Sequence, residues 1–280
     1  MKFYFEKNSS KKEKRELSVE IKEKEKFIDL ALKEVSNSLR EKGFLVDSSC
    51  RLNLEELIKT DIYSPSIVKK DIKKAKRKEE IFRQEEKTLL RKGKTKEWYL
   101  KKIGEIVEKL KTISFNNFWF RGKFFALRTS LYDDYFNGVD QIILDANPKK
   151  PKVLAAIDTT SLKGAWQEKV EKIIEKIKNP EKIKIDYGVV ARKEKNTLKI
   201  EYKELKGIPL LILAFKENEE EILKWFSALE NQDKNYLNLL LKDQLTKLKE
   251  QCKIFSQIAH PSLKREYCLL EKFFEKEKSL

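Results

Sequence analysis

The chain has 280 residues, with 62 Lys and Arg against 46 Asp and Glu, which gives a formal net charge of +16 at pH 7. Its hydrophobic content of 40% is enough for a sizeable core and excludes a globally disordered protein. Three separated cysteines and a single histidine, His260, exclude a disulfide framework, a Cys- or His-rich zinc site and catalysis by paired histidines. The longest apolar run, residues 209–215, is too short to span a bilayer, and no Gly-rich phosphate-binding motif occurs. We therefore expect a protein of the reducing cytoplasm with no membrane segment.

Residues 1–113 are predicted to form a basic helical region. Apolar residues recur at helical spacing over residues 10–42, and Gly43 follows the end of that helix. Further helices are expected over residues 53–59, 65–91 and 95–113. The long charged faces of these helices are typical of an arm that lies beside a globular core.

The positive charge is concentrated in one window of the chain. Residues 61–130 hold 20 Lys and Arg against 9 Asp and Glu, a net charge of +11. A basic surface attracts polyanions through counterion release, which predicts nucleic-acid binding. The expected contacts on the helix over 65–91 are Lys73, Lys74, Lys76, Arg77 and Lys78. The alternative is that these side chains simply form the solvent-exposed face of a helix.

Residues 114–215 have the character of an α/β core. Helical periodicity covers residues 124–136, and Asn137-Gly138 would end that helix. Strands are expected over residues 139–145, 153–159, 183–192, 197–202 and 210–215, with a helix over 162–178. This order predicts a mixed central sheet with a crossover helix. Residues 216–280 then return to helices, over 218–229, 234–258 and 262–278.

Aromatic and basic residues alternate at the start of this core. Arg121 and Lys123 lie among the phenylalanines and the tryptophan of residues 115–125, and Arg128 follows three residues later. Aromatic rings can stack on bases while cations hold phosphates, so we count these three basic residues among the nucleic-acid contacts. Packing of the aromatic residues between the helical arm and the core is the alternative.

Acidic residues follow directly on the basic window. Asp133 and Asp134 fall in the last turn of the helix expected over 124–136, Asp140 opens one strand, and Asp158 ends the next. If the two strands are neighbours, Asp140 and Asp158 can converge, and strand alternation places Thr160 on the same face as Asp158. Carboxylates at strand ends can bind Mg²⁺ through oxygen. The alternative is that these acids are caps or ion-pair partners.

This pattern resembles the PD-(D/E)XK nuclease superfamily. Its members show a helix with an acid, then Gly-x-Asp opening a strand, then an acidic residue, any residue and Lys on the next strand. Here Asp133 or Asp134 matches the helix acid, Gly138-Val139-Asp140 the first strand motif, and Asp158-Thr159-Thr160 the second. The resemblance implies a mixed central sheet of the PD-(D/E)XK nuclease type, with long helical extensions at both ends.

The resemblance also implies a metal-dependent site. Mg²⁺ or Mn²⁺ would be held by Asp133, Asp134, Asp140 and Asp158, and the catalytic residues would be Asp140, Asp158, Thr160 and Lys163. Thr160 stands where the superfamily usually has Lys, whose amine positions or activates the attacking water. Lys163 then supplies the amine from a shifted position, or the site is inactive.

Three interpretations remain open from the sequence. The first is a Mg²⁺-dependent endonuclease, and the second is a catalytically inactive nucleic-acid-binding protein on the same fold. The third is an interaction protein whose C-terminal helices bind a protein partner, because residues 201–280 carry no net charge. The sequence does not distinguish DNA from RNA as the nucleic acid.

Overall fold

The structure is a computed structural model that describes residues 11–119, 124–145, 152–161, 166–194, 197–215 and 219–278. The first helices are α1 (Lys11–Glu41), α2 (Leu54–Leu57), α3 (Pro65–Arg91) and α4 (Thr95–Ser114). The central part contains β1 (Phe124–Arg128), β2 (Gln141–Asp145), β3 (Lys152–Ser161), α5 (Trp166–Lys178), β4 (Lys184–Glu194), β5 (Thr197–Lys206) and β6 (Leu210–Phe215). The chain then forms α6 (Glu219–Glu230), α7 (Lys234–Ile258) and α8 (Pro261–Lys278). Three short turns complete the elements: η1 (Phe115–Trp119), η2 (Asp133–Asn137) and η3 (Pro180–Lys182).

A four-stranded mixed sheet with the strand order β1-β2-β3-β6 forms the centre of the molecule. The pairs β1–β2 and β2–β3 are antiparallel, and β3–β6 is parallel. The parallel pair is joined through α5 and the hairpin β4–β5, which forms a two-stranded sheet of its own. The fold is therefore mixed α/β with helical segments at both ends, as the sequence predicts at this level.

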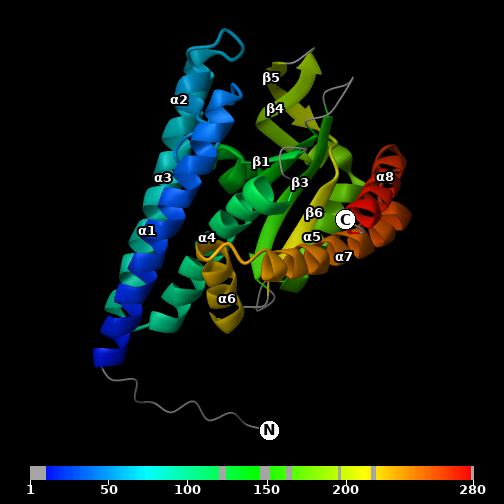
Figure 1. Cartoon of the computed structure of the whole chain (residues 1–280). Coiled ribbons are helices and arrows are strands. Elements are labelled where there is room, and N and C mark those ends of the chain that lie inside the picture. Colours follow the sequence, from blue (N-terminus) through cyan, green and yellow to red (C-terminus); the bar gives the residue numbers. More distant parts are fainter. Residues whose placement is uncertain are drawn as a thin grey trace.

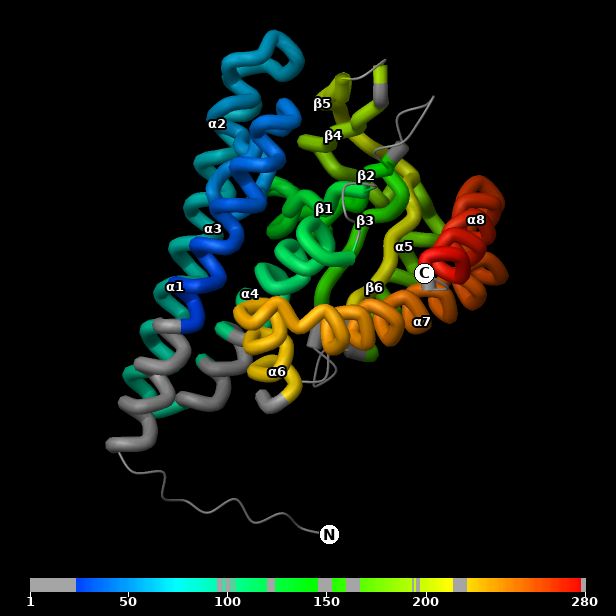
Figure 2. Tube along the Cα trace, in the orientation of Figure 1, coloured from blue at the N-terminus to red at the C-terminus, as the bar shows by residue number. Residues whose placement is uncertain are grey.

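Helices enclose the sheet from more than one side. In Figure 1, α1 and α3 lie at one side of the molecule, α4 lies between them and the sheet, and α7 and α8 lie at the opposite side. Both α1 and α3 contact α4, and α7 contacts β6. The trace in Figure 2 follows the same arrangement along the chain. Because the sheet is covered in this way, its strands are almost continuously apolar.

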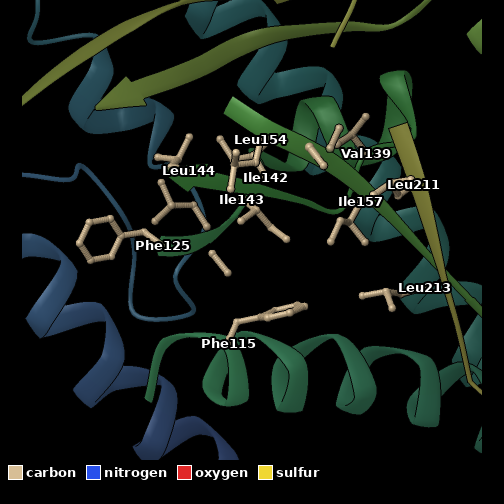
Figure 3. Close-up of a cluster of buried hydrophobic side chains, with 14 of the residues drawn as sticks. Phe115, Phe125, Val139, Ile142, Ile143, Leu144, Leu154, Ile157, Leu211 and Leu213 are labelled. Carbon is tan, nitrogen blue, oxygen red and sulfur yellow. The ribbon is translucent and has the colours of Figure 1, made fainter. Parts of the chain in front are cut away.

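One continuous cluster of buried hydrophobic side chains extends from Ile28 in α1 to Phe274 in α8. Figure 3 shows Phe115 pointing from the end of its helix toward the strands that carry Ile143, Ile157 and Leu213. The three regions expected from the sequence, residues 1–113, 114–215 and 216–280, all contribute to this cluster.

Two expectations about the core are wrong. The helix expected over 124–136 does not form, because Phe124–Arg128 is strand β1, buried along its whole length and paired with β2. A short run of large apolar residues is compatible with either a helix or a buried strand. Here the hydrogen bonds to β2 make it a strand. Only residues 131–137 turn helically, and Gly138, with φ at 63°, ends the turn in the left-handed region. The strands expected over 183–192 and 197–202 also exist, but they pair with each other outside the main sheet.

Candidate functional site

The structure brings Asp140 and Asp158 to adjacent strands. Gln141, the first residue of β2, is paired with Ile157 of β3. Because the two strands are antiparallel, Asp140, which comes just before β2, lies beside Asp158. The Asp140 backbone N–H donates to the Ile157 carbonyl at 3.0 Å, and Asp140 Oδ2 accepts the Thr159 N–H at 2.5 Å. Both acids are buried, with 7% and 6% of their surface exposed. The convergence expected from the two strand motifs is therefore present.

Burial and mutual repulsion act on these two carboxyl groups. Burial, reinforced by the charge of Asp140, raises the pKa of Asp158 to about 7. Burial and the neighbouring Asp134 also raise the pKa of Asp140, which Lys169 and Lys111 oppose. Acids arranged in this way bind a cation readily, because a positive charge between them relieves both effects.

Lys169, in the first turn of α5, is the cation that meets Asp158. Its Nζ lies 2.5 Å from Asp158 Oδ1 and donates to the Thr159 carbonyl oxygen at 2.7 Å. Burial opposes the charge on Lys169, but Asp158 and Asp140 outweigh it and raise the pKa of the amine. Lys169 is therefore an ammonium group in contact with two oxygen atoms of β3.

A second lysine reaches the site from α4. The side chain of Lys111 is completely buried, and its Nζ donates to Thr159 Oγ1. Burial lowers the pKa of Lys111 to about 8, although the charges of Asp140 and Glu108 act in the opposite direction. Two lysines from different helices thus approach the same short segment of β3.

Glu108, one turn before Lys111 on α4, connects the site to a network of ion pairs. Arg128 Nη2 donates to Glu108 Oε2 at 2.9 Å, and Arg51 Nη2 lies 3.9 Å from the same oxygen. Arg51 Nη2 also lies 2.7 Å from Asp134 Oδ2. Burial and the charge of Asp140 raise the pKa of Glu108, while the two arginines oppose the shift. Glu108 and Asp134 therefore belong electrostatically to the Asp140 site.

A cavity of about 640 Å³ lies beside this network, between α3, α4 and η2. Glu108, Arg128 and Asp134 line it, together with other acids and bases of α3 and α4. Several of these charges are paired with each other, as in Lys102–Glu86 at 3.5 Å. The lining is therefore of mixed charge and has no basic character of its own.

Asp133 has a different environment from Asp134, although the two are consecutive. Its carboxylate accepts hydrogen bonds from Ser130 Oγ and Asn137 Nδ2, each at 2.7 Å. It also accepts the backbone N–H groups of Asp186 and Tyr187, at 2.7 and 3.2 Å. Asp133 thus ties the turn η2 to β4, and its oxygens are already engaged in structural hydrogen bonds.

The basic residues expected to bind nucleic acid lie in different environments. Lys73, Lys74, Lys76 and Arg77 are exposed on α3, and Lys78 is partly exposed. Lys74 pairs with Asp71 at 3.2 Å and Lys76 with Glu55 at 2.8 Å. Arg128 is different, because it is only 3% exposed and pairs with Glu108, so it is not a surface contact.

Some predicted residues cannot be placed by side chain. Arg121, Lys123 and Lys163 lie outside the described residues. Thr160 is in β3, two positions after Asp158, and its backbone pairs with Ala214 of β6.

The donor atoms at the two strands suit a hard cation. Within the described parts of the chain, no three Asp, Glu, His or Cys side chains are placed to share a metal ion. Mg²⁺ needs fewer, because it keeps several waters and commonly binds through one or two carboxylates. Asp140, Asp158 and the Thr159 carbonyl oxygen form such a set, and two of these oxygens already hold an ammonium group.

Three residues of the site, all on helices, were not predicted from the sequence: Glu108, Lys111 and Lys169. The available signal was a charged residue on an apolar helix face. Lys111 follows Val107 by four residues, and Lys169 precedes Ile173 by four, so each lysine shares a face with a buried aliphatic side chain. A lysine at such a position needs acidic or polar partners inside the fold.

No protein-family model, curated protein or solved structure matches this chain. Among the helices of the described residues, none combines the length and apolar character needed to cross a membrane.

Proposed function

We propose that the protein binds nucleic acid and hydrolyses phosphodiester bonds with a divalent metal ion held at Asp140 and Asp158. The observation that carries this proposal is that two buried acids lie side by side at adjacent strands and that Lys169 of α5 meets one of them. The basic helix α3 supports a polyanionic substrate.

The connectivity supports an affinity with the PD-(D/E)XK nucleases. Gly138-Val139-Asp140 leads into β2, Asp158-Thr159-Thr160 lies in β3, and α5 follows. In the superfamily motif a lysine stands at the position of Thr160. We propose that Lys169 of α5 supplies that amine here, a role for which Lys163 was the candidate from the sequence. Glu108 and Asp134 are the further acids of the site, whereas Asp133 is structural.

Each residue then has a chemical task. Asp140, Asp158 and the Thr159 carbonyl oxygen would hold Mg²⁺ or Mn²⁺. When bound there, the metal would lower the pKa of a coordinated water and would offset negative charge on the phosphodiester. Lys169 would place positive charge beside the reacting phosphate, and the exposed lysines of α3 would hold the flanking backbone. Lys111 is completely buried and supports the Thr159 side chain from inside the core.

The test is cleavage of labelled single- and double-stranded DNA and RNA with Mg²⁺ or Mn²⁺, against an EDTA control. Asp158→Asn keeps the volume of the side chain and removes its charge, so we expect it to abolish cleavage. Asp243→Asn is the matched control, because Asp243 forms an exposed ion pair with Lys247 on α7. Absence of cleavage by the wild-type protein, together with absence of metal binding, would contradict the proposal.

A catalytically inactive nucleic-acid-binding protein is the second candidate. The observation that favours it is that Lys169 already neutralises Asp158. Salt-sensitive nucleic-acid binding without metal binding or cleavage would support this alternative.

A further inference from the structure

Lys169 lies on the oxygen atoms that the proposed metal site would use. Its Nζ is 2.5 Å from Asp158 Oδ1 and 2.7 Å from the Thr159 carbonyl oxygen. A divalent ion ligated by these same oxygens would occupy the space in which the ammonium group now lies. The ammonium group and the ion cannot both do so, because they repel each other and require the same lone pairs.

We propose that Lys169 is an internal cation of the site, which a divalent metal ion has to displace from Asp158 and the Thr159 carbonyl oxygen before it binds. The inference rests on the proposed metal site and adds a competition to it. In the metal-free state, Lys169 compensates the buried charge of Asp158. Metal binding then exchanges one cation for another.

The neighbouring lysines of α5 do not share this position. Lys172 is exposed and pairs with Glu168 at 2.6 Å on the same helix. Lys176 donates to the Asn137 carbonyl oxygen at 2.8 Å. Among these three lysines of α5, Lys169 is therefore the one that contacts the oxygen atoms of β3, and Lys172 is a matched control from the same helix.

The Lys169 side chain can move away from Asp158 and still remain near the other acids of the site. The Lys169 side chain is 32% exposed, and it is attracted by Asp140 and Glu108 as well as by Asp158. An ammonium group released from Asp158 thus stays beside the acids of the site. In that position it can orient a water or stabilise negative charge on a phosphate.

The competition can be measured by titrating Mn²⁺ into the metal-free protein by calorimetry. Lys169→Met removes the charge and keeps the length of the stem, so we expect it to bind Mn²⁺ at least about tenfold more tightly than the wild type. Lys169→Arg keeps the charge and should bind Mn²⁺ as the wild type does. Lys172→Met should leave the affinity unchanged.

A measurement on the wild-type protein does not depend on the folding of any variant. Lys169 and Lys172 are labelled with an amine-reactive reagent, and the labelling rates are followed by mass spectrometry with and without Mn²⁺. We expect Mn²⁺ to raise the labelling rate of Lys169 and to leave that of Lys172 unchanged.

The outcomes separate the competition from the metal site. Equal Mn²⁺ affinities of the wild type and Lys169→Met, with binding lost in Asp158→Asn, would overturn the competition and leave the site in place. An unchanged or lower labelling rate of Lys169 at saturating Mn²⁺ would overturn the competition as well. Absence of Mn²⁺ binding by the wild type and by Lys169→Met would overturn both the competition and the proposed metal site.

Discussion

Asp133 and Asp134 are adjacent on the turn η2, yet their carboxylates serve different parts of the molecule. Asp134 pairs with Arg51 at 2.7 Å and acts electrostatically on Asp140. Asp133 accepts hydrogen bonds from Ser130, Asn137 and the backbone of β4. Consecutive residues on a helical turn point in different directions, so neighbours in sequence need not share a function.

Asp133→Asn should destabilise the fold. Both carboxylate oxygens of Asp133 accept hydrogen bonds from N–H groups, so either orientation of the amide would point an NH₂ group at another donor. A buried donor left unsatisfied costs about 1–3 kcal/mol, and we expect a loss of that size in the free energy of unfolding. Urea denaturation measures it, with Asp243→Asn as the exposed control. A loss below about 0.5 kcal/mol, the range of ordinary surface substitutions, would contradict the structural role of Asp133.

The lowered pKa of Lys111 makes the free energy of unfolding depend on pH. Its pKa is lowered from 10.5 to about 8, so below pH 8 the folded state carries the full penalty of a buried charge. Between pH 8 and 10.5 the folded state gives up this proton more readily than the unfolded state. The free energy of unfolding should therefore rise over this window by up to about 3 kcal/mol relative to Lys111→Met. Denaturation curves that keep a constant difference between the two proteins across this range would contradict the prediction.

The strands that carry the site could be predicted from the sequence, whereas the contacts that the helices make with them could not. Asp140 and Asp158 follow from local patterns, namely a Gly-x-Asp entry into one strand and an acid at the end of an apolar run. Lys169 meets Asp158 only because the parallel pair β3–β6 requires a crossover, which sets α5 against the sheet. The strand Phe124–Arg128 was missed for a related reason, since its pairing with β2 is a tertiary effect that overrides helical spacing.

The outer face of α3 should carry nucleic-acid affinity. Lys70, Lys73 and Arg77 are exposed and share one face at helical spacing. Reversing all three to Glu should weaken binding and reduce the slope of log affinity against log salt by about 2–3, because each phosphate contact contributes about 0.9. Filter binding or fluorescence anisotropy across a salt series measures the slope.

The matched control reverses the same number of charges on the other side of the molecule. Lys242, Lys253 and Lys264 are exposed on α7 and α8, so their replacement by Glu changes the net charge equally. If both triple variants lower the slope to the same extent, overall charge and not α3 drives the binding.

The C-terminal helices are part of the same hydrophobic core as the sheet. Trp225 of α6 donates its indole N–H to Ser114 Oγ at 2.9 Å, and its ring stacks on Trp119 with centroids 5.9 Å apart. Trp119 in turn donates to the Leu237 carbonyl oxygen of α7 at 3.0 Å. These contacts join residues on both sides of the region boundary expected at 215. A protein partner for α7 and α8 stays a prediction.

Trp225→Ala should therefore destabilise the whole core and not only the helix α6. Truncation of a buried Trp costs about 3–5 kcal/mol, and we expect that loss in the free energy of unfolding. Leu239→Ala is the control, because Leu239 is 66% exposed and its truncation should cost little. Circular dichroism should show helix and sheet signals lost together in Trp225→Ala. Loss of part of the helix signal, with the sheet signal retained, would contradict a shared core.

Diffraction from a crystal soaked in Mn²⁺ tests whether a cation site lies between Asp140 and Asp158. We predict an anomalous peak about 2.1 Å from a carboxylate oxygen of each acid, with the Lys169 amine moved away from Asp158. Saturating Mn²⁺ with no peak at this position, and with Lys169 still paired to Asp158, would contradict it.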